Sequence, residues 1–244
     1  VGGVGKSRLA IQAAATILPR FPDGAWLCEL ASVTDEHLVA DTVADAVGVP
    51  AGSGPAREAL PWYLRNRKAL LVIDNCEHLL APVISLVDDL LARCPQVVVL
   101  ATSREPLGVE GEHVYVLDTL LPPVDGDARA VQASSAGRLF VERAQAARRD
   151  FVLDDDNAGA VAQICARLDG IPLAIELAAA RVRSLTPAQI LDRLDERFRL
   201  LTGGAKTRAR HQTLRGALAW SAELLPEAER TAFARLSVFV APFD

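Results

Sequence analysis

The stretch VGGVGKSRLAIQAAATIL, residues 1–18, joins a glycine-rich turn to an alanine- and leucine-rich helical pattern. Gly5-Lys6-Ser7 fits the end of the phosphate-loop pattern G-x-x-x-x-G-K-[ST], whose first glycine would stand one position before Val1. In such a loop, backbone N–H groups freed by glycine point at phosphates, with a helix N-terminus behind them. The alternative is a turn that opens an ordinary helix, and the rest of the chain has to decide between the two.

On the phosphate-loop interpretation, Lys6 reaches the β- and γ-phosphates of a nucleotide, and the Ser7 hydroxyl ligates Mg²⁺. The glycines let the backbone approach the ligand closely. The predicted nucleotide-binding residues at this end of the chain are Gly2, Gly3, Val4, Gly5, Lys6, Ser7 and Arg8.

Composition sets broad limits. The chain has 244 residues, of which 50% are hydrophobic and 23% charged, enough for one large domain or two to three small ones with a sizeable core. The formal net charge of −5 gives no overall electrostatic footprint for nucleic acid. No signal-peptide layout and no apolar run of about 18 residues is present, so we expect a cytoplasmic protein without a membrane partner.

The four cysteines are widely separated and form no C-x-x-C pair. Each stands in an apolar context, which predicts buried free thiols in a reducing compartment. They are Cys28, Cys76, Cys94 and Cys165.

Strand and helix patterns alternate through the first half of the chain. Strands are predicted at 25–30, 69–75, 97–104 and 113–117, with helices at 8–18, 38–47, 57–67 and 79–91 between them. The apolar runs ALLVIDN and VVVLATSR are typical of strands buried on both faces. The alternation predicts an α/β fold with a parallel sheet flanked by helices.

From about residue 120 onward the pattern becomes helical. We expect helices at about 134–149, 157–168, 172–183, 187–195, 211–223 and 226–237. The polar stretch TGGAKTRAR, residues 202–210, indicates a linker. The predicted domains are an α/β domain over 1–118, a helical bundle over 119–201, and a linker with a further module over 202–244.

Two polar positions follow predicted strands. Asp74 ends a buried apolar strand, where the Mg²⁺-holding aspartate of a nucleotidase belongs. Arg104 follows the next strand and could contact a γ-phosphate. The alternatives are an aspartate that caps the next turn and an ordinary surface arginine. With Lys6 at a predicted helix start, the combination predicts a nucleotide site whose catalytic residues are Lys6, Asp74 and Arg104, and whose Mg²⁺ ligands are Ser7 and Asp74.

Five segments resemble one known family, the NB-ARC or AP-ATPase branch of the STAND P-loop ATPases. The resemblance is to the group found in bacterial transcriptional regulators of the LuxR and AfsR type. It rests on GGVGKSRLA, LLVIDNCEHLL, VVVLATSREPLGVEGE, LDGIPLAIELAAARV and RHQTLRGALAWSAELLPEAERTAFARLSVF. It implies a P-loop NTPase sheet, a small helical bundle and the start of a winged-helix module.

The resemblance also implies a function. Members act as switches in which ADP holds a closed form and exchange for ATP, prompted by a signal, opens it. Pro172 in Gly170-Ile171-Pro172 matches a proline that packs near the adenine in the family, although these residues would also serve as helix punctuation. The implied partners are the nucleotide, other domains of the parent regulator and an ATP-dependent homo-oligomer, with DNA contacted through a separate domain.

This sequence departs from the family in two respects. Many relatives have a second acidic residue directly after the strand-ending aspartate, and here that position is Asn75, so we expect slow hydrolysis; Glu77 stands nearby. The strand that leads into the phosphate loop is absent. It would lie centrally in the sheet, so we expect unpaired strand edges, poor nucleotide binding and aggregation of the segment alone.

Three rival interpretations remain open at this point. A basic run of Lys206, Arg208, Arg210 and Arg215 could touch DNA phosphates or be a solvated linker. A continuously cycling motor would need a catalytic carboxylate beside Asp74. An interaction scaffold with an inactive site would not need Lys6, Ser7 and Asp74.

Overall fold

The computed structural model describes residues 2–198 and 227–236. Its contacts define two compact units. The sheet unit is Lys6–Val116, and the helical unit consists of Val1–Gly5 together with Leu117–Asp244. The units divide after Val116, whereas the sequence prediction puts the boundary after residue 118. The predicted boundary after residue 201, the basic run and nearly all of the predicted winged-helix segment lie outside the described residues.

The sheet unit contains three parallel strands in the order β1-β2-β3. These are β1 (Ala25–Glu29), β2 (Leu70–Asp74) and β3 (Val98–Ala101), and its helices are α1 (Lys6–Ile17), α2 (Val39–Val47), α3 (Ala56–Leu64) and α4 (Leu80–Arg93). Short 3₁₀ turns lie at η1 (Leu18–Arg20), η2 (Glu36–Leu38) and η3 (Cys76–His78). The predicted α/β class with a parallel sheet is confirmed.

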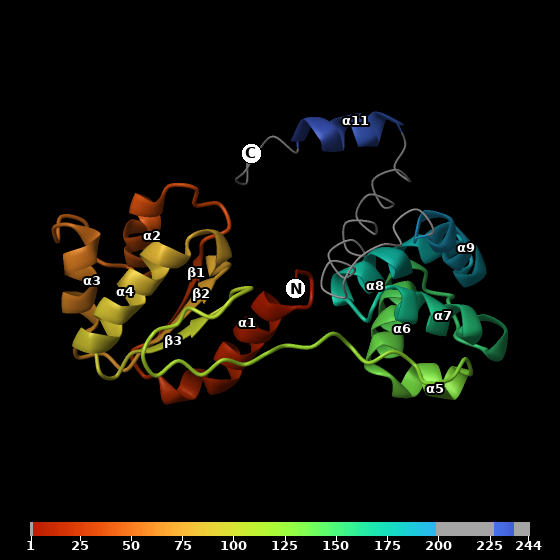
Figure 1. The fold of residues 1–244 in the computed structure, drawn as a ribbon, viewed down its shortest axis with the longest axis horizontal. Coiled ribbons are helices and arrows are strands. Elements are labelled where there is room, and N and C mark those ends of the chain that lie inside the picture. Colours follow the sequence, from red (N-terminus) through yellow and green to blue (C-terminus); the bar gives the residue numbers. More distant parts are fainter. Residues whose placement is uncertain (1, 199–226, 237–244) are drawn as a thin grey trace. The chain divides into compact units, whose positions relative to one another are not determined.

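Side-chain alternation along β2 assigns its two faces to different helices. Leu70 and Val72 pack with Ala10 and Ala14 of α1. Leu71 and Ile73 face the larger core formed with α2, α3 and α4. Figure 1 shows α1 on one side of the sheet and these three helices on the other. A strand covered on both faces can be apolar throughout, which is why ALLVIDN has no polar alternation.

Helix α1 runs antiparallel to the strands, as Figure 1 shows. Only residues 18–24 connect it to β1, so its C-terminal end lies at the amino end of that strand. A 12-residue helix is about 18 Å long and a five-residue strand about 17 Å. The N-terminus of α1 therefore lies at the carboxyl edge of the sheet.

One sequence-based expectation about strands is wrong. Residues 113–117 form neither helix nor strand, and Tyr115 is 79% exposed. The Val-Tyr-Val pattern has strand-like residue types, but this segment pairs with no described strand. In the order β1-β2-β3, β2 is paired on both edges, whereas β1 and β3 each have one edge without a partner among the described strands. The expected consequences of an absent strand, poor nucleotide binding and aggregation, stay predictions.

The helical unit is built around one apolar core that includes Phe140, Ile164, Ile171 and Ile175. Its elements are α5 (Ala128–Ala133), α6 (Ser135–Ala147), α7 (Asp155–Arg167), α8 (Pro172–Ala179), η4 (Ala180–Arg183), α9 (Pro187–Phe198) and α11 (Glu227–Leu236). Four predicted helices between 134 and 195 are confirmed, and so is the one near the C-terminus; α5 was not predicted, and 211–223 lies outside the described residues. None of the described helices is long and apolar enough to cross a membrane.

Gly170 fixes the turn between α7 and α8. Its φ is +65°, and its carbonyl accepts a hydrogen bond from the Leu120 N–H at 2.9 Å. A Cβ at Gly170 would lie 1.9 Å from the Leu120 carbonyl oxygen. Glycine is therefore required here by both the backbone conformation and the close approach.

Gly170→Ala should reduce the free energy of unfolding by at least about 3 kcal/mol, because strain and a backbone clash add together. Gly159→Ala is the matched control in the same unit: it lies inside α7, with only an ordinary contact of 3.8 Å to the Gly126 oxygen. That variant should gain up to about 1 kcal/mol of helix propensity. Urea unfolding followed by circular dichroism measures both, and equal effects would contradict the account.

All four cysteines are free and buried, as predicted. The pKa values of Cys28, Cys76 and Cys165 are raised to about 12, mainly by burial, and for Cys76 the charges of Asp74 and Glu77 contribute to the rise. A raised thiol pKa means that the folded state holds its proton more tightly than the unfolded state, whose pKa is about 9. The resulting stability is present below pH ~9 and is lost as the pH rises toward 12.

The free energy of unfolding should therefore fall as the pH is raised from about 9 to about 11. Removing one thiol should flatten this fall, so Cys28→Ala should reduce the slope by up to about 1.4 kcal/mol per pH unit. Urea titrations at several pH values measure the slope separately from the absolute loss caused by the smaller side chain. Parallel slopes for the two proteins would contradict the prediction.

Candidate functional site

Asp74 and Thr102 lie side by side at the carboxyl edge of the sheet. Asp74 is the last residue of β2, and Thr102 directly follows its parallel neighbour β3. The Thr102 hydroxyl donates to Asp74 Oδ1 at 2.5 Å and accepts from the Asn75 N–H at 3.0 Å. Among the described residues, Thr102 is the one buried polar side chain, with 5% exposure. Its hydroxyl therefore fixes the carboxylate from inside the protein.

Backbone hydrogen bonds hold the same edge. The Thr102 N–H donates to the Ile73 carbonyl at 2.9 Å, and the Cys76 N–H donates to the Thr102 carbonyl at 3.0 Å. On the other side of β2, the Leu30 N–H donates to the Asp74 carbonyl at 3.0 Å. The position of Asp74 is thus set by the segments that follow both neighbouring strands, β1 and β3.

Asn75 turns the chain away from the sheet with a φ of +65°, a conformation that asparagine tolerates better than most residues. Its side-chain amide lies 3.3 Å from His78 Nδ1, and His78 Nε2 lies 2.8 Å from the Val33 carbonyl oxygen. A carbonyl can only accept, so Nε2 carries the proton and Nδ1 accepts from Asn75. Asn75 therefore has a structural role in this turn.

Arg104 forms an ion pair with Glu77. Its Nε lies 2.8 Å from Glu77 Oε1, and the side chains are 53% and 17% exposed, respectively. Glu77 Oε2 is buried without a hydrogen-bond partner in the described part of the chain. Both residues could be singled out from the sequence, but their pairing could not, because 26 residues that include helix α4 separate them.

The other predicted residues of the sheet unit are Lys6, Ser7 and Arg8, at the start of α1. Lys6 is partly buried, and Ser7 and Arg8 are exposed. Because α1 is antiparallel to the strands, these residues lie at the same edge of the sheet as Asp74. The sheet unit therefore brings Lys6, Ser7, Asp74 and Arg104 to one end of the sheet, and their roles toward a nucleotide stay predictions.

The remaining predicted residues belong to the helical unit. Gly3 and Gly5 have positive φ values of 73° and 96°, and the Gly3 carbonyl accepts a hydrogen bond from the Leu173 N–H at 3.2 Å. Pro172 is the first residue of α8, so its interpretation as helix punctuation is confirmed. Its predicted adenine contact, and the predicted phosphate contacts of residues 2–5, stay predictions.

The oxygen donors present fit the needs of Mg²⁺. This ion takes few protein ligands, in general one or two carboxylates, and completes its shell with water and phosphate oxygens. Asp74 and the Ser7 hydroxyl provide such donors, and Thr102 occupies only Oδ1 of Asp74. No cluster of three or more His, Cys, Asp or Glu that could cage a metal occurs in the described residues. The donor set suits an ion that arrives with phosphates.

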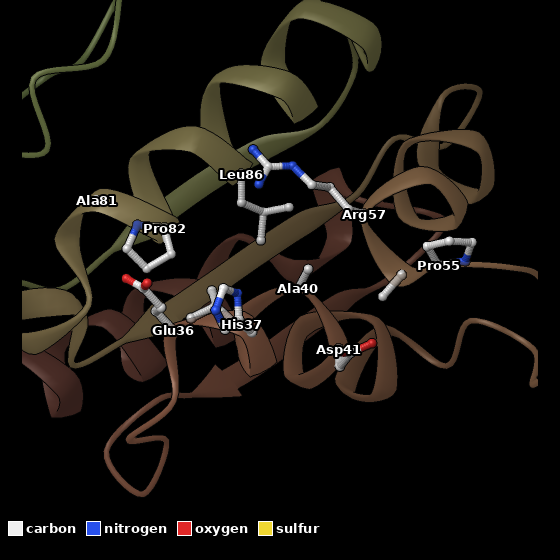
Figure 2. Close-up of a pocket in the computed structure, with 11 residues that line it drawn as sticks. Glu36, His37, Ala40, Asp41, Pro55, Arg57, Ala81, Pro82 and Leu86 are labelled. Atoms are coloured by element: carbon white, nitrogen blue, oxygen red, sulfur yellow. The ribbon is translucent and has the colours of Figure 1, made fainter.

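A separate cavity of about 440 Å³ lies between the first turns of α2, α3 and α4 (Figure 2). Glu36, His37, Asp41 and Arg57 line it together with alanine and proline side chains, and Arg57 donates to the Ser85 hydroxyl. Its lining carries both signs of charge and includes none of the predicted site residues. The cavity therefore favours no single ligand chemistry.

No family model matches the chain. Two proteins, from Mycobacterium bovis and Mycobacterium tuberculosis, each named "Putative HTH-type transcriptional regulator", are 46% identical to it over 245 residues, which cover 100% of this chain and 26% of each relative. A Mycobacterium tuberculosis protein named "Uncharacterized protein" is 43% identical over 244 residues, or 99% of this chain and 60% of its own length. The chain thus spans about a quarter of the length of the first two relatives.

Thr102→Val should destabilise the protein by about 2 kcal/mol, because it keeps the shape of the side chain but leaves the partly buried Asn75 N–H and Asp74 Oδ1 without their partner. Thr102→Ser keeps the hydroxyl and loses one methyl group, so it should lose only about 1 kcal/mol. Urea unfolding measures both variants. If serine is as harmful as valine, the hydroxyl does not hold the carboxylate.

Proposed function

We propose that the chain is a nucleotide-dependent switch module of a transcriptional regulator, binding ATP or ADP with Mg²⁺. The observation that carries the proposal is the convergence of Asp74, Thr102 and the N-terminus of α1 at one edge of a parallel sheet. Ligands of open α/β sheets bind outside the carboxyl ends of the strands. The P-loop fold and the switch family are part of this proposal.

Each residue of the sheet unit has a defined task in the proposal. Lys6 neutralises charge on the β- and γ-phosphates, and the first turn of α1 offers backbone N–H groups to them. Asp74, held in one rotamer by Thr102, and the Ser7 hydroxyl hold the metal ion, which when bound offsets phosphate charge. Arg104 contacts the γ-phosphate.

Slow hydrolysis is consistent with this arrangement. The amide of Asn75 cannot accept a proton and is engaged with His78, so it does not serve as a general base. A site that holds phosphates firmly but turns over slowly suits a switch better than a motor. The names of the relatives support the regulatory setting. In that setting we propose that DNA is contacted by another domain.

The direct test is calorimetric titration of the full-length native protein with ATP and with ADP in the presence of Mg²⁺. Lys6→Ala should weaken binding of both nucleotides at least about tenfold, because a charge-assisted contact with phosphate is worth about 1.5–3 kcal/mol. Lys68→Ala is the matched control: this lysine is exposed and stands just before β2, at the opposite end of the sheet. Unchanged binding by Lys6→Ala, or loss by both variants, would refute the assignment.

Arg104→Ala separates recognition of the γ-phosphate from general phosphate binding. It should weaken ATP binding by about tenfold and leave ADP binding nearly unchanged, because ADP lacks the group that Arg104 contacts. The same titrations measure the ratio of the two dissociation constants. An equal loss for ATP and ADP would contradict the proposed role.

A further inference from the structure

The ion pair between Arg104 and Glu77 engages a particular nitrogen of the guanidinium group. Glu77 Oε1 accepts from Nε, the nitrogen nearest the side-chain stem, at 2.8 Å. A guanidinium has five N–H donors, four of them on the two terminal nitrogens. No hydrogen bond from these terminal nitrogens is found within the described residues. The contact therefore orients the group and keeps its outer donors for another acceptor.

The exposed fractions of the two side chains also indicate that Arg104 reaches outward from Glu77. Glu77 is the less exposed partner, at 17% exposure, and Arg104 is the more exposed one, at 53%. Glu77 stands in η3, directly after the turn at Asn75 that Thr102 and His78 hold in place. The backbone that carries Glu77 is thus fixed to the sheet edge, and the arginine extends from its carboxylate toward solvent. A partly buried acceptor on a fixed turn, under a long flexible side chain, is an arrangement that pre-organises the donor.

The pair also lies close to the proposed metal ligand. The charges of both Asp74 and Glu77 act on the thiol of Cys76, which stands between them in sequence. Backbone hydrogen bonds tie Cys76 to Thr102, the residue two positions before Arg104. Asp74, Glu77 and Arg104 therefore belong to one small region at the carboxyl ends of β2 and β3.

We infer that Glu77 is a positioning residue for nucleotide recognition: by holding Arg104 Nε, it aims the terminal nitrogens of Arg104 at the γ-phosphate and so sets the preference for ATP over ADP. This inference rests on the proposed function and adds a residue that makes no contact with the nucleotide itself. The resulting gain in ATP affinity is entropic, because an arginine that is already held in place loses less side-chain freedom when ATP binds.

The positioning role and a simple charge effect predict opposite results for Glu77→Gln, so this variant distinguishes between them. Glu77→Gln removes one negative charge near an anionic ligand, so simple electrostatics would strengthen the binding of both nucleotides. The amide oxygen of glutamine accepts more weakly than a carboxylate, so looser positioning of Arg104 should instead weaken ATP binding by about three- to tenfold while ADP binding is not weakened. Glu105→Gln makes the same change in charge at an exposed residue directly after Arg104 and should not weaken ATP binding.

The experiment is a calorimetric titration of the full-length native protein and its variants with ATP and with ADP, each with Mg²⁺. In an Arg104→Ala background, Glu77→Gln should not weaken ATP binding further, because the group that it positions is gone. Glu77→Leu, which removes the acceptor without burying an amide, should weaken ATP binding at least as much as Glu77→Gln. Thermal unfolding of each variant verifies that it is folded.

The titrations distinguish failure of the proposed function from failure of the positioning role of Glu77. If the wild-type protein binds neither nucleotide, the proposed function fails and this inference fails with it. If the wild type binds ATP but Glu77→Gln and Glu77→Leu bind it equally well or more tightly, the positioning role is overturned and the proposed function stands. The same holds if the Glu77 effect persists without Arg104, or if ATP and ADP binding weaken equally.

Discussion

The parallel pairing of β2 with β3 is the constraint on which the candidate site depends. It puts the last residue of one strand, Asp74, beside Thr102 at the end of the other, where a buried hydroxyl joins them. The same edge receives the N-terminus of α1 because a short connection forces that helix to run antiparallel to the strands. Without this pairing, Lys6, Asp74 and Arg104 would be three polar residues far apart in sequence and without a common location.

Much of the fold and part of the candidate site could be predicted from the sequence. Apolar runs such as ALLVIDN identify buried strands because both faces are covered, and the helical stripes of the second half are equally regular. Residues 113–117 misled the prediction, because Val and Tyr favour strands by type while pairing depends on a partner elsewhere in the chain. Thr102 lies near the end of the predicted strand at 97–104, and its residue type alone does not mark it as a site residue. Its tie to Asp74, and that of Arg104 to Glu77, depend on strand order, which residue types do not encode.

Energies limit what any single residue of the site can do. Shifting a two-state protein from almost fully closed to almost fully open requires about 5.5 kcal/mol of differential binding. One charge-assisted contact, such as Arg104 with a γ-phosphate, supplies about 1.5–3 kcal/mol. A switch built on this site must therefore combine that contact with others or with a second signal. Pre-organisation by Glu77 increases the binding free energy that Arg104 can contribute, because a smaller part of the contact's free energy is lost in ordering the side chain.

The central claim is that one edge of the sheet holds a nucleotide by its phosphates. The most direct measurement is to identify the small molecules released on denaturing the full-length native protein after purification and extensive desalting. The account predicts bound ADP, as expected for a switch purified in its resting state. A protein that releases no nucleotide, and that takes up neither ADP nor ATP when incubated with them and Mg²⁺, would contradict it.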